Sequence, residues 1–125
     1  MQPARLFDRR VQRSPESPLA LRFQLEATKA RAGLEAVVLA NDEGLPLASA
    51  GDGAICQELA AVAPFLGRGH FGLPLPPMLR GAEVAVRPML VHGMPIYLAT
   101  VGGSVARDAL LVTSLRGVER ILTRN

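Results

Sequence analysis

A glycine-rich stretch is the part of this sequence whose spacing most directly suggests chemistry. Gly67-Arg-Gly-His-Phe-Gly72 has the G-x-G-x-x-G spelling of a dinucleotide-binding loop. Such a loop binds pyrophosphate where a strand leads into a helix N-terminus, whereas a helix is expected before this stretch and prolines follow it. Gly102-Gly103-Ser104 does lie between an expected strand and helix, but it lacks the lysine and spacing of a phosphate loop. We therefore predict no cofactor at either segment.

Metal and nucleophile chemistry have no better support in the residue types. His70 and His92 fall in separate expected turns, and no cysteine or carboxylate stands at a spacing that would complete a metal site with either. Cys56 is the only cysteine, so an intramolecular disulfide is excluded, and no activating base stands beside it. We expect a small buried side chain there. No nucleophile-elbow sequence surrounds the candidate serines Ser49, Ser104 and Ser114.

Two further patterns concern binding rather than catalysis. Pro74-Leu-Pro-Pro77 has the composition of a polyproline segment that docks in an aromatic groove, although one short copy in a loop also fits a stiffened connection. Four arginines share the expected last helix, where a solvated face and favourable charge near the helix C-terminus explain most of them, with a partner surface as the alternative. These are Arg107, Arg116, Arg120 and Arg124.

Composition excludes several classes of function. The chain has 125 residues and a formal net charge of +3, but four arginines against two acidic residues in the first 18 positions supply most of that charge. No basic face for nucleic acid emerges. No apolar run approaches the roughly 18 residues of a membrane span, and no apolar block of a secretory signal follows the first arginines. We expect a cytoplasmic protein that binds neither nucleic acid nor membrane.

The elements that position these residues begin with an arm and a helix. Residues 1–18 are rich in proline, serine and arginine and predict a flexible basic N-terminal arm, followed by one domain over residues 19–125. Ser17-Pro18 starts a helix, and Gly33 ends it in the left-handed conformation. Its expected apolar side consists of Leu19, Leu21, Phe23, Leu25 and Ala32.

Two β-hairpins are expected, each with one central and one edge strand. Residues 36–40 are apolar at consecutive positions, which predicts a strand covered on both faces. After a turn at 41–44, the strand at 45–50 contains Pro46, which favours an edge position or restricts the pairing of the strand at that residue. Residues 82–90 and 94–101 form the second hairpin. Its first strand contains Pro88 and is expected at an edge, and its second is nearly all apolar.

The middle and last helices complete the pattern. Asp52 caps the middle helix, and Pro64 is expected to kink or end it near Ala63, before a loop over residues 67–81. Its expected core side is Ile55, Leu59, Val62 and Leu66, while alanines keep another side thin. The last helix has apolar residues at heptad-like intervals, Leu111, Leu115, Val118 and Leu122, although residues 110–114 could instead form another strand.

The expected order is helix, hairpin, helix, hairpin, helix, which predicts an α+β domain with an antiparallel sheet between helical layers. This order, together with the turn and strand Gly44-Leu-Pro-Leu-Ala-Ser49, resembles the roadblock (dynein light chain) family over most of residues 19–124. The resemblance implies a three-layer α/β/α sandwich with four or five antiparallel strands. The family usually has a fifth strand, for which the sequence offers no secure position.

The resemblance also implies a function. Roadblock proteins are dimers in which edge strands pair and middle helices pack, and similar bacterial members occur with Ras-like GTPases, including the polarity switches of gliding bacteria. It thus implies a non-enzymatic, homodimeric regulator or adaptor of a small Ras-like GTPase, with that GTPase or another roadblock protein as its partner. Two alternatives stay open: a scaffold dimer with no GTPase partner, and a small-molecule-binding sensor domain.

The expected dimer surface combines the edge strand of the second hairpin with the thin side of the middle helix, because open edges pair and small residues permit close helix contacts. Its residues are Ala60, Ala61, Ala63, Val84, Ala85, Val86 and Arg87. Arg68 and Arg80, in the loop after that helix, are the partner-binding candidates. Any effect on GTP hydrolysis is expected to come from positioning the GTPase's own residues rather than from a supplied arginine finger.

Overall fold

The computed structural model describes residues 17–70, 74–103 and 107–123. Residues 1–16 of the expected arm (1–18) therefore lie outside the described part, as do Ser104 and Arg124. The fold order agrees with the expected order. The elements are α2 (Ser17–Ala32), β1 (Leu34–Asn41), β2 (Pro46–Gly51), α3 (Gly53–Gly67), the short 3-10 helix η1 (Pro77–Leu79), β3 (Val84–Val91), β4 (Met94–Gly102) and α4 (Arg107–Thr123).

The described strands form one antiparallel sheet of four strands in the order β2-β1-β4-β3. The two mostly buried strands, β1 and β4, are central, and the two strands that contain Pro46 and Pro88 are at the edges. Both placements were expected, since proline removes a donor from the ladder. No fifth strand occurs within the described residues.

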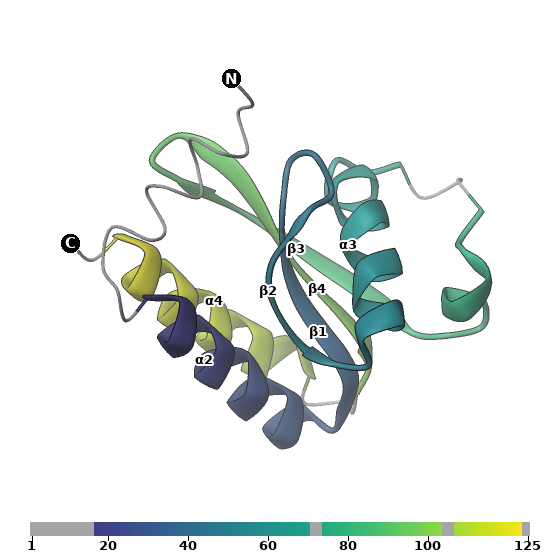
Figure 1. Cartoon of the computed structure of the whole chain (residues 1–125), viewed down its shortest axis with the longest axis horizontal. Coiled ribbons are helices and arrows are strands. Elements are labelled where there is room, and N and C mark those ends of the chain that lie inside the picture. Colours follow the sequence, from purple (N-terminus) through teal and green to yellow (C-terminus); the bar gives the residue numbers. More distant parts are fainter. Residues whose placement is uncertain (1–16, 71–73, 104–106, 124–125) are drawn as a thin grey trace.

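Helices cover both faces of this sheet, which makes three layers (Figure 1). Successive side chains of β1 point to opposite faces of the sheet, so they pack against different helical layers. Val37 and Leu39 pack on the side of α2 and α4, whereas Ala36 and Val38 pack on the side of α3. A buried hydrogen bond of 2.7 Å between the hydroxyls of Thr28 and Ser114 joins α2 to α4. The predicted α/β/α sandwich is therefore confirmed.

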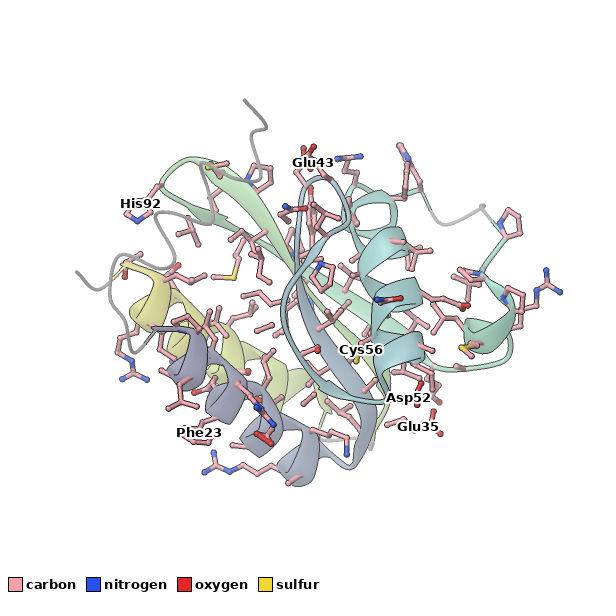
Figure 2. The ribbon with its side chains drawn as sticks, viewed as in Figure 1. Phe23, Glu35, Glu43, Asp52, Cys56 and His92 are labelled. Carbon is pink, nitrogen blue, oxygen red and sulfur yellow. The ribbon has the colours of Figure 1, made fainter. Side chains whose placement is uncertain are left out.

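The buried side of α2 differs from the expected one. Leu21 and Leu25 are fully buried, but Leu19 and Phe23 are 53% and 60% exposed. Residues two apart on a helix lie on nearly opposite sides, so the alternating pattern could not form one apolar face. Figure 2 shows Phe23 on the side of α2 that faces away from the sheet. Gly33, with φ of +66°, ends the helix as predicted.

The buried side of α3 is also rotated from the expected one. Leu59 is buried as predicted, but Ile55, Val62 and Leu66 are only half-buried. The sheet is instead contacted by a stripe with smaller side chains, Cys56, Leu59, Ala60 and Ala63. Small residues allow a helix to lie close to a sheet, and the larger residues then pack at its flank.

The ends of α3 show one confirmed and one wrong prediction. Asp52 caps the helix, because its Oδ2 accepts a hydrogen bond of 3.1 Å from the backbone N–H of Ile55. The helix does not end near Ala63 but continues through Pro64 to Gly67. Proline removes only one backbone donor, and the Pro64 side chain is buried within the fold.

The turn of the second hairpin and the last helix both agree with the sequence analysis. His92 and Gly93 have φ of 52° and 77° and form the two-residue turn expected between β3 and β4. Residues 110–114 belong to α4, so the alternative of a further strand there is wrong. Val118 and Leu122 are buried against the sheet side shared with α2, as the heptad-like spacing predicted.

Candidate interaction surface

The open edge of β3 is the starting point for a candidate site. Within the described residues, β3 pairs only with β4. Val84 and Val86 lie opposite Val101 and Ala99 on the face covered by α3, and both valines are half-buried. Ala85 lies on the other face, which α2 and α4 cover. The expected interface residues of this strand therefore divide between the two faces of the sheet, and those facing α3 are apolar.

A groove of about 430 Å³ separates this edge from the end of α3. One wall consists of Val84, Val86 and Pro88, and the other of residues 66–69. The structure thus brings Arg68, a predicted partner-binding residue, beside two predicted dimer residues that lie far from it in the sequence. Arg80 is not part of this groove. It follows η1, where its Nε donates a hydrogen bond of 3.3 Å to the carbonyl of Leu75.

The Arg68 guanidinium is held by the turn between β1 and β2. Its Nη2 lies 2.5 Å from Oδ1 of Asp42 and 3.2 Å from the Asp42 carbonyl oxygen. The same carboxylate oxygen accepts a hydrogen bond of 2.9 Å from the Tyr97 hydroxyl. The hydrogen bond from Arg68 is the main reason why the pKa of Asp42 is lowered. Burial, and then the hydrogen bond to Asp42, raise the pKa of Tyr97.

This turn is itself fixed by local hydrogen bonds and by close packing. The Asn41 side-chain oxygen accepts hydrogen bonds from the backbone N–H groups of Glu43 and Leu45, at 2.9 and 3.0 Å. Gly44 has φ of +81°, and a Cβ there would lie 3.2 Å from Cα of Ala61. The turn therefore rests on α3. Only glycine combines this backbone conformation with so close an approach.

The outer side of α3 does not have the composition expected for a dimer contact. Ala60 and Ala63 are 0% exposed within the protomer, so their expected role at a dimer surface is wrong. Ala61 remains exposed, as does Phe65 at 44%. The sequence analysis did not identify Phe65, because its place on the helix becomes clear only once the buried stripe is known.

A second, apolar hollow continues from the groove. Its volume is about 250 Å³, and it is lined by Val62, Phe65, Leu66, His70, Pro74 and Leu75. Leu66 lines both this hollow and the groove beside β3. We use the name α3–β3 surface for this area together with the exposed Ala61 of α3, which lines neither hollow, and define the surface by Ala61, Phe65, Leu66, Val84 and Val86.

Among the described residues considered for metal binding, His70 and His92 lie in separate loops. The ring centroids of His70 and Phe65 are 6.4 Å apart, whereas His92, labelled in Figure 2, lies in the β3–β4 turn. Among the described residues, no group of three or more histidine, cysteine, aspartate or glutamate side chains could hold a metal ion. Cys56 is buried, its thiol donates to the Ala50 carbonyl at 3.5 Å, and burial raises its pKa.

None of the helices in the described part of the chain has the length and apolar character needed to cross a membrane.

The acidic and basic side chains near the α3–β3 surface, Asp42 and Arg68, form a salt bridge with each other. The arrangement therefore offers an apolar edge and groove for a macromolecular contact.

Neither a protein-family model nor a curated protein matches the sequence. The structure, however, is similar to that of Myxococcus xanthus MglB, with a TM-score of 0.57 and 14% sequence identity. The similarity covers 88% of this chain and 95% of that chain, so it extends over most of both. At this identity it is a likeness of fold: the chain has the roadblock-like α/β/α fold, which it shares with Myxococcus xanthus MglB.

Proposed function

We propose that this chain is a homodimeric, non-enzymatic regulator or adaptor of a small Ras-like GTPase. Two lines of argument support this proposal. The sequence resembles the roadblock family, whose bacterial members occur with such GTPases, and the fold is similar to that of MglB over most of both chains. The expected cytoplasmic location is part of the same proposal.

The main support for a dimer is the open edge of β3. Among the described strands β3 pairs only with β4, so its outer edge favours pairing with a second strand, and Val84 and Val86 add apolar area on the α3 side. Pro88 limits such pairing to residues 84–87. In a symmetric dimer the same residues meet across the two-fold axis, so the exposed side of α3, with Ala61 and Phe65, packs against its copy.

The position of Arg68 supports a positioning mechanism for the GTPase. An arginine finger must project toward the γ-phosphate, whereas this guanidinium is joined to Asp42 by a salt bridge. Arg68 also lines the groove beside β3, so a dimer carries two such sites near its seam. The dimer then offers a fixed, two-subunit surface to a Ras-like GTPase or to another roadblock protein, and the GTPase supplies its own catalytic residues.

Two measurements test this function. Sedimentation at tens of micromolar should show a dimer, and Val86→Pro should weaken it while circular dichroism shows that the variant remains folded. Calorimetry with the cognate GTPase should show binding that depends on the bound nucleotide, while the protein alone hydrolyses no GTP. A dimer that binds the GTPase in neither nucleotide state would be a scaffold, and a monomer would contradict the proposal altogether.

A further inference from the structure

The opposite edge of the sheet carries a second groove. Within the described residues, β2 pairs only with β1, and α2 lies beside it (Figure 1). The space between α2 and β2 has a volume of about 660 Å³. Its α2 wall includes Arg22, Glu26 and Lys29, and its β2 wall consists of residues 47–51. This groove is separate from the α3–β3 surface, because β2 and β3 are the two outermost strands.

Part of β2 is free of the features that hinder pairing with a further strand. A bulge skips Leu47, since Leu39 pairs with Ala48 and Ala40 pairs with Pro46. Bulges and prolines protect an edge strand, so the first two residues of β2 are unsuited to further pairing. Ala48 and Ala50 lie on the α2 side and are small. The segment 48–51 therefore combines an open edge with room above it.

The charges along α2 indicate what kind of segment fits. Lys29 is half-buried beside the groove, and no hydrogen bond or ion pair joins it to another described residue. Arg22 is paired with Glu26 at 3.5 Å, but both side chains are largely exposed, so this pair adds little stability and exchanges readily. The wall thus has two basic groups and one acidic group, and it favours an acidic occupant over the chain's own arginine-rich residues 1–16.

We propose that the α2–β2 groove binds an extended acidic segment of a partner protein. The segment adds to β2 as a further strand, with backbone hydrogen bonds to residues 48–51, and its carboxylates pair with Lys29 and Arg22. This proposal does not depend on the dimer or on the GTPase. If β3 edges pair in a dimer, the α2–β2 grooves lie at the two outer edges of the joined sheet and the protein is bivalent.

The experiment uses the full chain and a blocked strand-forming peptide, Thr-Val-Glu-Val-Asp-Val-Thr, at concentrations up to about 1 mM. Two altered peptides serve as controls. One has lysine in place of both acids, and the other has N-methyl groups on alternate backbone amides, which block strand pairing without changing charge. Chemical-shift changes in labelled protein should map to residues 47–51 and to α2. The acidic peptide should bind at least about tenfold more tightly than either control.

Protein variants separate the groove from general charge effects. Lys29→Glu should weaken binding of the acidic peptide by about tenfold or more, whereas Arg116→Glu, on the exposed side of α4, should leave it unchanged. Equal binding of the three peptides, equal effects of the two variants, or no binding would overturn the proposal. Strong protection from hydrogen exchange, before peptide is added, of those β2 amides that point away from β1 would also overturn it, because the outer edge would already be covered by residues 1–16 or by a second copy.

Discussion

Arg68 at the end of α3 and Asp42 in the β1–β2 turn form a salt bridge of 2.5 Å across 26 positions of the sequence. The same Asp42 carboxylate accepts a hydrogen bond from the Tyr97 hydroxyl. One side chain therefore links the β1–β2 turn to the end of α3 and to the central strand β4. This link joins the helix end that forms one wall of the groove beside β3 to the β1–β2 turn. The shape of the α3–β3 surface therefore depends on a residue that lies outside it.

The Asp42 link predicts a definite response to acid. The pKa of Asp42 is lowered in the folded protein, chiefly by the Arg68 hydrogen bond, so its contribution to stability is present above the unfolded value of 3.8. That contribution is lost as the pH falls through the folded value. Melting temperatures of the unaltered protein and of Asp42→Asn should therefore differ by a constant amount from pH 7 to about pH 5 and converge below pH 4. A difference that grows on acidification would contradict this assignment.

Removing the arginine tests the same link from the other side. Arg68→Ala should raise the pKa of Asp42 toward 3.8, which carboxyl chemical shifts in an NMR titration would measure. With the cognate GTPase, stimulated hydrolysis should fall by less than about tenfold, because losing a true arginine finger lowers the rate by roughly 10³ or more. Arg80→Ala is the matched variant outside the groove. A variant that binds normally but no longer stimulates hydrolysis would show that the arginine is catalytic.

Gly67 is predicted to be intolerant of even one methyl group. A Cβ at Gly67 would overlap the Tyr97 ring, which is 3% exposed and cannot move aside. Gly67→Ala should lower the free energy of unfolding by about 1–3 kcal/mol, measured by urea denaturation. Gly53→Ala, at the start of the same helix, is the control, because nothing lies within 4 Å of its added Cβ. Equal effects of the two substitutions would show that loss of glycine, rather than the overlap, matters.

The dimer proposal predicts different roles for two exposed phenylalanines. Phe65 lies on the α3–β3 surface and Phe23 lies on α2, at 44% and 60% exposure. Phe65→Asp should weaken dimerisation by about tenfold or more in sedimentation experiments, because it places a charge in an apolar contact. Phe23→Asp should leave the dimer unchanged. If both variants sediment like the unaltered protein, α3 is not part of the dimer contact.

The sequence alone determined the order of elements and the place of each strand in the sheet. Consecutive apolar residues in 36–40 and 94–101 require cover on both faces, whereas Pro46 and Pro88 remove ladder donors, so central and edge strands follow from local chemistry. The Asp52 cap and the Gly33 stop are local in the same sense, and both are present. These features depend on neighbours a few residues away, which the sequence displays directly.

Only the tertiary structure decided which sides of the helices face the sheet and which distant side chains meet. Alanine suits either a sheet contact or an exposed side, so burial of Ala60 and exposure of Ala61 depend on how closely α3 approaches the sheet. Phe23 is exposed because the stripe of Leu21 and Leu25 already fills the space under α2. The Asp42–Arg68 pair depends on the packing of a turn against a helix end, and no periodicity encodes that contact.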